Sequence, residues 1–559
     1  MLLKRLQCVL ALSAMFCLVL ASSLFAAEPA VEARNGMVVS VSPEASDAGV
    51  EILRKGGNAV DAAVTTAFAL AVTYPQAGNI GGGGFMLVYP PKAEPKLFEY
   101  RECAPAAATA DMFVNQKSTY KHNVVGVPGT VRGLALAHER FGKLPWKDLV
   151  LPAIRLADDG FVMDSSLARS LNEVLAKPEG FPELLRVYGK NGGKDQWQAG
   201  DRLVQPDLAK TLRLIAEKGP DAFYTGPIAD QIVAEMKSGG GLVTKQDLAH
   251  YQAHERKPIH GNYRGYDISA PPLPSSGGTC LVEMLNILEN FDLRKEGRYS
   301  AKTCHLMAEA MQRAYCDRAR YLGDDAFVEI PARLTTKEYA RELAKSIPLD
   351  RVTRSEDLAK DIPLSKESDN TTHFSIIDRD GMAVSNTYTL EHSYGSKIVV
   401  RGAGFLLNNE MSDFNWKPGV TSRYGQIGTS PNQIAPRKRM LSSMTPTIVA
   451  KDGKPLLITG SPGSRTIINT VLCVTVNVID FDMNIRDAVD APRMHHAWFP
   501  DELVMEGDTP LGIRKELLAL GHKLGGAKQG DAHSIWIDPK TGLYYGAADK
   551  RIHGKASGY

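Results

Sequence analysis

Two adjacent threonines, Thr371 and Thr372, follow a long polar segment that ends at Asn370. A threonine hydroxyl is a poor nucleophile near neutral pH. It becomes an effective one when the threonine is the first residue of its chain, because its own α-amine then accepts the proton. A polar linker is a suitable place for the required cut. These residues also fit an ordinary loop before an ordinary strand, so the choice depends on the rest of the chain.

The segment after these threonines has the pattern of a β-hairpin, which would hold them in place. Two runs rich in Val, Ile, Thr, Phe and Tyr flank Asp380-Gly381, a strong turn signal. The runs are residues 372–378 and 383–389. If Asp380 and Gly381 form a two-residue loop, Thr389 lies opposite Thr372 and diagonal to Thr371. The sequence thus predicts that threonines meet at one end of the hairpin.

Length and charge limit the classes of protein. The chain has 559 residues, 44% of them hydrophobic, which is ample for a large core. Residues 1–27 carry Lys4 and Arg5, then an apolar run and small residues, as in a secretory signal. A retained membrane anchor is the alternative. Without this segment the 65 basic residues become 63, equal to the 63 acidic ones, so nucleic acid is not an expected partner.

Five cysteines remain after the predicted signal, and none of them has C-x-x-C spacing. They are Cys103, Cys280, Cys304, Cys316 and Cys473. An odd number with this spacing indicates neither a zinc site nor a disulfide framework. Most are expected to be small buried side chains.

The first part of the chain is predicted to be mainly helical and the second part rich in strands. Helices are expected at 43–56, 58–74, 130–141, 146–158, 207–218, 227–237, 276–289 and 301–322. Strands are expected at 447–450, 455–459, 534–537 and 544–546, with a helix at 467–479. The glycine run 81–84 lacks the spacing of a nucleotide-binding loop, so tight backbone packing is the preferred interpretation.

Other motifs suggest rival chemistries. S-x-x-K at 118–121, S-D-N at 368–370 and K-T-G at 540–542 occur in the order used by β-lactamases, but no buried helix is predicted to hold Ser118. His495-His496 with Asp501 and Glu502 do not have the spacing of a standard metal site. The basic run 437–439 is expected to be a solvated face.

Eight motifs occur along the chain: G-G-N-A-V-D-A-A (56–63), P-Q-A-G-N-I-G-G-G-G-F (75–85), R-E-C-A-P (101–105), P-L-P-S-S-G-G (272–278), T-T-H-F-S (371–375), L-N-N-E-M-S-D-F (407–414), L-S-S-M-T-P-T (441–447) and G-S-P-G (460–463). In this order, over roughly 400 residues, they resemble those of the γ-glutamyltransferases (γ-glutamyl transpeptidases). The family belongs to the N-terminal-nucleophile hydrolases, whose precursor cuts itself into two subunits.

The resemblance implies an α+β fold, a four-layer α-β-β-α sandwich in which a helix-rich large subunit interleaves with a strand-rich small one. Residues 28–370 would form the large subunit and 371–559 the small catalytic subunit. Pattern alone would instead suggest two separate domains.

The resemblance also implies roles for individual residues. Thr371 would be the nucleophile, with Thr389 orienting its hydroxyl, and Asn370-Thr371 the cleavage site. Gly463 and Ser464 would donate backbone N–H groups to the oxyanion. The substrate α-carboxylate would be held by Arg101, Ser442 and Ser443, and the α-ammonium by Glu410 and Asp413. The stretch 418–429, with Tyr424, resembles a lid over the substrate.

Two positions depart from the family pattern. Ser464 stands where members usually have a second glycine, which keeps the N–H but restricts the backbone. Glu391 stands where members usually have an asparagine that helps to bind the ammonium. If the strand continues past Thr389, Glu391 faces the substrate and brings a third carboxylate to the site, so at least one carboxyl pKa there should rise.

The implied reaction is transfer or hydrolysis of the γ-glutamyl group of glutathione and related compounds through an ester on Thr371. No metal or organic cofactor is expected. Amino acids or dipeptides would be acceptors, and the protein would be periplasmic or secreted. An acylase of the same superfamily, acting on glutaryl-cephalosporins or poly-γ-glutamate, and an inactive binding homologue remain as alternatives.

Overall fold

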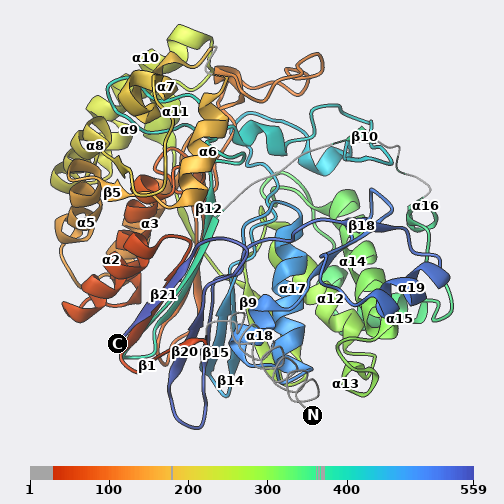
Figure 1. Cartoon of the computed structure of the whole chain (residues 1–559). Coiled ribbons are helices and arrows are strands. Elements are labelled where there is room, and N and C mark those ends of the chain that lie inside the picture. Colours follow the sequence, from red (N-terminus) through yellow and green to blue (C-terminus); the bar gives the residue numbers. More distant parts are fainter. Residues whose placement is uncertain (1–28, 178–179, 360–361, 363–364, 367–371) are drawn as a thin grey trace, which may run out of the picture.

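The computed structural model describes residues 29–559 apart from 178–179, 360–361, 363–364 and 367–371. Two antiparallel sheets of seven strands lie at its centre (Figure 1). The first has the order β21 (Lys555–Gly558), β2 (Gly36–Ser40), β11 (Thr372–Asp378), β12 (Ala383–Thr389), β3 (Gly83–Tyr89), β4 (Lys96–Glu99), β7 (His254–Arg256). The second has the order β1 (Val31–Ala33), β20 (Tyr544–Ala547), β19 (Ser534–Ile537), β15 (Lys454–Thr459), β14 (Thr447–Lys451), β9 (Tyr266–Ala270), β8 (Ile259–Tyr263).

Each sheet combines strands from both sides of the predicted cleavage site. In the first sheet β11 pairs with β2, and β12 pairs with β3. In the second sheet β14 pairs with β9, and β20 pairs with β1. The two parts of the chain therefore form one fold and not two separate domains.

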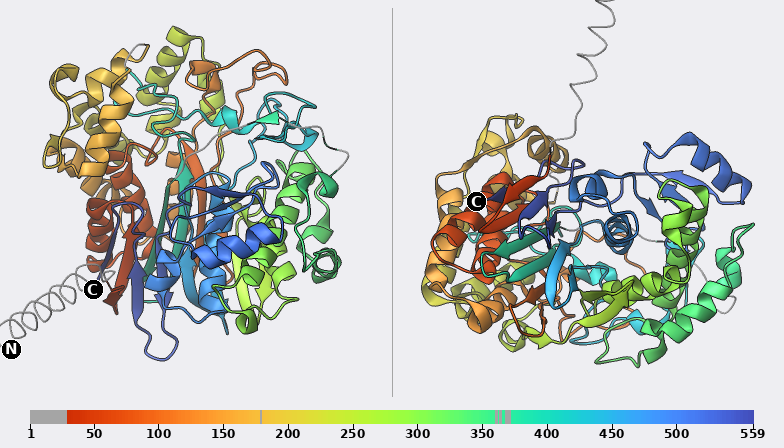
Figure 2. Two further views of the ribbon diagram at one scale, coloured as in Figure 1. Left: turned by 45° about the vertical axis from the view of Figure 1, so that its right-hand side comes forward. Right: turned by 90° about the horizontal axis from the view of Figure 1, so that it is seen from below.

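Helices cover the outer face of each sheet, so the molecule has four layers. Helices α2 (Pro43–Arg54) and α3 (Ala59–Thr73) lie on the first sheet, whereas α12 (Ser276–Leu288) and α17 (Thr466–Ile479) lie on the second (Figures 1 and 2). Strand β2 shows the layering, because Val38 packs among the first helices while Met37 and Val39 pack between the sheets. The predicted α-β-β-α sandwich is confirmed.

The remaining helices and strands surround this sandwich. The other helices are α4 (Thr130–Phe141), α5 (Trp146–Asp158), α6 (Ser165–Leu175), α7 (Pro182–Tyr188), α8 (Pro206–Lys218), α9 (Asp221–Tyr224), α10 (Pro227–Gly239), α11 (Lys245–His250), α13 (Leu293–Glu296), α14 (Ala301–Tyr321), α15 (Lys337–Lys345), α16 (Ser355–Leu358), α18 (Ile485–Asp490) and α19 (Leu511–Ala519). Short 3₁₀ helices are η2 (His122–Val124), η3 (Lys190–Gly193), η4 (Ala332–Thr335), η5 (Glu410–Asp413) and η6 (Ser430–Asn432). The small sheets are β5 (Phe161–Val162) with β6 (Arg202–Leu203), β10 (Ser365–Lys366) with β13 (Gly425–Gln426), and β16 (Met494–His495), β17 (Leu503–Met505) and β18 (Leu524–Gly526).

Helix α3 shows how local sequence fixes an element. The Asn58 side chain accepts hydrogen bonds from the backbone N–H groups of Val60 and Asp61, both at 3.0 Å. In return the Asp61 carboxylate accepts from the Asn58 N–H at 3.0 Å, which completes a capping box. Every residue of α3 is buried, in agreement with a sequence that is apolar on nearly every side.

The glycine run 81–84, which leads into β3, packs tightly against the backbone, as predicted, and it supports the end of β12. A side chain at Gly82 would collide with the backbone oxygen of Thr389. The neighbouring Asn79 side chain donates to that same oxygen at 2.8 Å. The run therefore allows the close approach that positions Thr389.

The predicted register of the hairpin is wrong by one residue. Thr372 lies opposite Tyr388, not Thr389. The loop has three residues, 379–381, because Asp378 and Met382 pair across it at 3.1 Å. Gly381, at φ 84°, takes the left-handed position that ends such a loop, whereas the prediction used it in a two-residue turn. Thr371 itself lies outside the described residues.

The five cysteines are free thiols, four of them buried, as predicted. In the part of the chain that the structure describes, no helix is both long and apolar enough to cross a membrane. The predicted signal segment lies outside that part.

Candidate active site

One pocket lies at the end of β12, and it gathers most of the predicted site residues. Eight of them line it: Arg101, Thr389, Glu391, Glu410, Asp413, Ser442, Ser443 and Ser464. They come from five separate stretches of the chain. Only the fold brings them together.

The other predicted site residues have different placements. Gly463 directly precedes Ser464 in the chain. Tyr424 is 65% exposed and does not line the pocket, although Ile427 and Thr429 of the same loop do. Asn370 and Thr371 lie outside the described residues, so the roles predicted for them stay predictions.

Arg101 is the charged centre of one side of the pocket. It lies two residues after β4, and its side chain is fully buried. Its Nη1 donates to the Glu410 carboxylate and its Nη2 to the Asp413 carboxylate. Its Nε donates to the backbone oxygen of Met440 at 3.2 Å. Burial of a guanidinium requires such compensation, because desolvation of an unpaired charge is costly.

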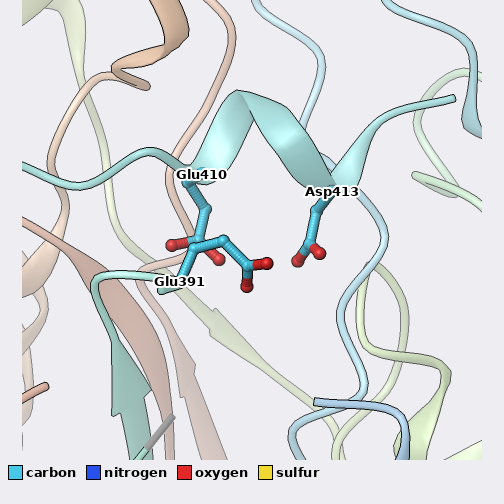
Figure 3. A group of neighbouring side chains, drawn as sticks. All are labelled: Glu391, Glu410 and Asp413. Atoms are coloured by element: carbon cyan, nitrogen blue, oxygen red, sulfur yellow. The ribbon is translucent and has the colours of Figure 1, made fainter. Parts of the chain in front are cut away.

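Three carboxylates meet beside this arginine. Glu410 and Asp413 extend from the single turn η5 toward Glu391, which follows the end of β12 (Figure 3). One oxygen from each carboxylate lies within 4.8 Å of the others. The cluster suits a cation. Because the guanidinium of Arg101 already contacts two of its members, an organic ammonium fits better than a metal ion.

The surroundings shift the pKa values of the buried acids. Burial, with repulsion from Asp413, raises the pKa of Glu410 to about 7, although Arg101 acts in the opposite direction. Burial and the proximity of Glu410 also hold the pKa of Glu102 well above its ordinary range. A carboxyl pKa is therefore raised as predicted, at Glu410, but burial is a larger cause than the crowding of like charges on which the prediction rested.

A tight turn brings Glu391 to the pocket. The strand ends at Thr389, so strand alternation does not explain where Glu391 points. Glu391 has φ 77°, in the left-handed region, and its N–H donates to the Thr389 hydroxyl oxygen at 2.8 Å. This bond fixes the orientation of the Thr389 hydroxyl. Asparagine adopts such a φ more readily than glutamate does.

Ser442 and Ser443 lie on an extended segment beside the start of α12. The Ser442 N–H donates to the oxygen of Pro274 at 2.8 Å. The Ser443 hydroxyl accepts from Nη2 of Arg318 at 3.0 Å, and Nε of Arg318 donates to the Ser276 hydroxyl at 2.9 Å. An arginine that the sequence analysis did not select thus holds a predicted substrate-binding serine.

Gly463 and Ser464 form the turn before α17. Their φ values are 121° and 47°, so the serine has accepted a left-handed conformation. Among the described residues, neither N–H donates a hydrogen bond to the protein. Both are therefore available to an oxyanion.

Sequence analysis missed several residues of the pocket wall. They are Arg318, Asn415, Asn432 and Arg465. The sequence did contain a signal for Arg465, because this residue directly follows Ser464, which was predicted to belong to the site. Arg318 had none, because α14 carries several arginines and nothing local distinguishes this one.

The structure describes the rival motifs only in part. Residues 368–370 lie outside the described residues, and Lys540 lies in the turn between β19 and β20. His495 bonds to the side chain of Asn469 at 2.7 Å, and burial lowers its pKa to about 3. The prediction that the basic run 437–439 is a solvated face is wrong. Lys438 and Arg439 are buried, and Arg439 pairs with Glu99 at 2.8 Å.

Comparison with known proteins gives one consistent result. The profile of a family described as Gamma-glutamyltranspeptidase matches residues 45–559. The chain is similar to the glutathione hydrolase proenzyme of Escherichia coli (strain K12), with 48% identity over 534 residues, 93% of this chain and 91% of that protein.

Solved structures agree on the fold. A cephalosporin acylase from Bacillus halodurans aligns with a TM-score of 0.85 and 29% identity, covering 96% of this chain and 97% of that one. A gamma-glutamyltranspeptidase from Helicobacter pylori aligns with a TM-score of 0.55 and 40% identity, over 59% of this chain and 94% of that one.

Proposed function

This chain belongs to the γ-glutamyltranspeptidase family, and from that premise we propose that it hydrolyses glutathione and transfers γ-glutamyl groups after cutting itself between Asn370 and Thr371. The observation that carries the proposal is the pocket at the end of β12. It offers a buried guanidinium, two serine hydroxyls and three carboxylates, which together suit the zwitterionic head of a γ-glutamyl group.

The head group would bind through complementary charges. Its α-carboxylate would meet Arg101 and the hydroxyls of Ser442 and Ser443, while its ammonium would lie among the carboxylates of Glu410, Asp413 and Glu391. Binding then replaces part of the pairing between Arg101 and its carboxylates with pairing to the substrate. The buried charges of the pocket therefore have partners of opposite charge both without and with the substrate.

The nucleophile would act at the end of the hairpin. Thr372 pairs with Tyr388, so Thr371 would lie opposite Thr389 if the pairing of β11 with β12 continued by one residue. The Thr389 hydroxyl oxygen already accepts from the Glu391 N–H, so its proton can be directed to the hydroxyl of Thr371.

The reaction has two halves. The Thr371 oxygen attacks the γ-carbonyl carbon, its α-amine takes the hydroxyl proton, and the N–H groups of Gly463 and Ser464 stabilise the oxyanion. The carbon–nitrogen bond breaks, the proton passes to the leaving amine, and an ester remains. Water then releases glutamate, or the amine of an amino acid or dipeptide takes the γ-glutamyl group.

The first test is Thr371→Ala, with Thr371→Ser as the control that keeps a hydroxyl. The alanine variant should remain one uncut chain without activity. Wild type should give a fragment of residues 371–559 whose N-terminal sequence begins Thr-Thr-His. A fragment that began at Thr372, or normal cleavage of the alanine variant, would refute the assignment.

A glutaryl acylase is the second candidate, since the acylase from Bacillus halodurans shares the fold. A glutaryl group has no ammonium, so it would leave the three carboxylates without a partner. We therefore expect wild type to prefer γ-glutamyl over glutaryl amides. Comparing kcat/KM for the matched pair decides this, and a preference for glutaryl would favour the acylase.

Localisation and partners complete the proposal. Residues 1–27 would direct export and be removed, which gives a periplasmic or secreted enzyme. Its two subunits would come from one precursor and stay together. The N-terminal sequence of protein recovered from outside the cytoplasm tests the first point.

A further inference from the structure

Besides Arg101, the pocket is lined by two further arginines. Arg318 on α14 and Arg465 before α17 both line it. Within the described part of the chain, neither forms an ion pair with a carboxylate. Both side chains are partly buried. Their positive charges therefore lack the carboxylate partners that compensate the charge of Arg101.

The two arginines lie on elements that touch. Tyr315, one turn before Arg318, donates its hydroxyl hydrogen to the backbone oxygen of Arg465. The bonds to Ser276 and Ser443 orient the guanidinium of Arg318, and no described residue bonds to its Nη1. Arg465 donates only a long bond, 3.4 Å, to the oxygen of Phe499. Both guanidinium groups therefore have donors left for a ligand.

Their position relative to the reaction indicates what they would bind. Arg465 directly follows Ser464, whose N–H faces the oxyanion in the proposed function. The leaving amine and the attacking amine use the same place beside that oxyanion, because one replaces the other. In glutathione this amine belongs to a dipeptide that ends in a carboxylate and spans at most about 7 Å.

We propose that Arg465 and Arg318 form an anion subsite that binds the carboxylate of the leaving peptide or of the incoming acceptor. The planar guanidinium matches the two oxygens of a carboxylate. This inference rests on the proposed function and extends it from the γ-glutamyl head to the other end of the substrate.

The donor test compares two substrates that share the γ-glutamyl group. Glutathione has a leaving group with a carboxylate, whereas a γ-glutamyl anilide has an uncharged one. Arg465→Gln should lower the ratio of kcat/KM for glutathione to that for the anilide by about ten-fold or more. Arg465→Lys, which keeps the charge, should recover part of the ratio.

The acceptor test uses transfer from the anilide to glycylglycine and to glycylglycine amide. Wild type should prefer the free carboxylate, and Arg465→Gln should lose that preference. A loss in the donor test alone assigns the subsite to the leaving peptide, and a loss in the acceptor test alone assigns it to the acceptor. Arg294→Gln is a matched control, because Arg294 is 61% exposed and pairs with Asp482 at 2.5 Å outside the pocket.

Arg318→Lys provides a second variant. It should reduce the same two ratios, together with a smaller loss on all donors because Ser443 loses its partner. If Arg465→Gln lowers kcat/KM for both donors equally and leaves the acceptor preference intact, the subsite is wrong. If wild type cleaves neither donor, the proposed function fails, and the subsite with it.

Discussion

The pocket contains two sets of arginines whose charges the protein compensates differently. We call Arg101 with its carboxylates the paired side, and Arg318 with Arg465 the open side. On the paired side, Arg101 is fully buried and contacts the carboxylates of Glu410 and Asp413. On the open side, Arg318 and Arg465 contact hydroxyl groups and backbone oxygens but no described carboxylate. The paired side is neutralised by the protein itself. The open side needs a ligand to supply the negative charge.

This difference indicates what each side can bind. A site with both signs of charge suits a zwitterion, because each ligand charge replaces part of an existing pair. A site with uncompensated cations suits an anion, since nothing has to be displaced. The free energy of unfolding should therefore depend on the paired side, and selectivity for the far end of the substrate on the open side.

The largest effect is expected from Arg101→Gln, which leaves buried carboxylates unpaired. The free energy of unfolding should fall by about 3–5 kcal/mol, and kcat/KM should fall at least a hundred-fold. Urea unfolding in the uncut Thr371→Ala background measures the first value without the effect of cleavage.

Arg465→Gln is the matched control from the open side, and it should cost less than about 1 kcal/mol. If both arginine variants lost the same free energy of unfolding, the proposed difference between the paired and open sides would be wrong. Because protonation removes the unpaired charges, the deficit of the Arg101 variant should shrink at lower pH.

Thr389→Ala should have the next largest effect, because in the proposed function its hydroxyl orients the Thr371 nucleophile and does not bind the substrate head. Slower maturation and a fall in kcat of about 10²-fold are expected, with little change in KM. Thr389→Ser, which keeps the hydroxyl, should retain most activity. An unchanged kcat with a much higher KM would place Thr389 in substrate binding.

Glu410→Gln tests the charge on the paired side. Since the pKa of Glu410 is raised to about 7, the wild-type side chain loses its charge as the pH falls through 7, and kcat/KM for γ-glutamyl donors should fall with it. The variant should lack this acid limb and have kcat/KM lower by about ten-fold at pH 8. A persistent acid limb would assign it to another group.

The same raised pKa has a consequence for stability with a definite sign. The folded state favours protonated Glu410, so the contribution of this group is complete below about pH 4.5 and is lost as the pH rises through about 7. Glu410→Gln should therefore become more stable relative to wild type as the pH rises over that range.

The smallest effect is expected from Glu391→Asn. Activity should persist, and the acid limb of kcat/KM should move to lower pH, because one like charge near Glu410 is gone. Asparagine also suits φ 77° better, so stability should rise by up to about 1 kcal/mol. An unchanged pH profile would show that Glu391 does not affect the charge of Glu410.

Sequence predicted the elements whose signals are local. The predicted bounds of α4 and α5 agree with the structure because both have local signals. Gly142 follows the last residue of α4, and Pro145 precedes Trp146, the first residue of α5. The hairpin was found for the same reason. Its register was missed because Asp-Gly fits both a two-residue and a three-residue loop, and only the pairing distinguishes them.

Features that depend on distant partners could not be predicted. Arg439 looked solvated because its partner Glu99 lies 340 residues away in the chain. Arg318 joins the pocket only because α14 packs beside the segment with Ser443. The eight predicted pocket residues came from the family resemblance, with the hairpin pattern adding support for Thr389, and neither signal included Arg318 or Arg465.

The mixed strand order of the two sheets changes the kinetics of assembly once the chain is cut. The strand pairs β2 with β11 and β3 with β12 form within a single precursor chain. After cleavage they would hold two separate chains together. Unfolding of the mature protein then releases two chains, so its melting temperature should rise with protein concentration, whereas that of uncut Thr371→Ala should not. Refolding likewise changes from a first-order to a second-order reaction.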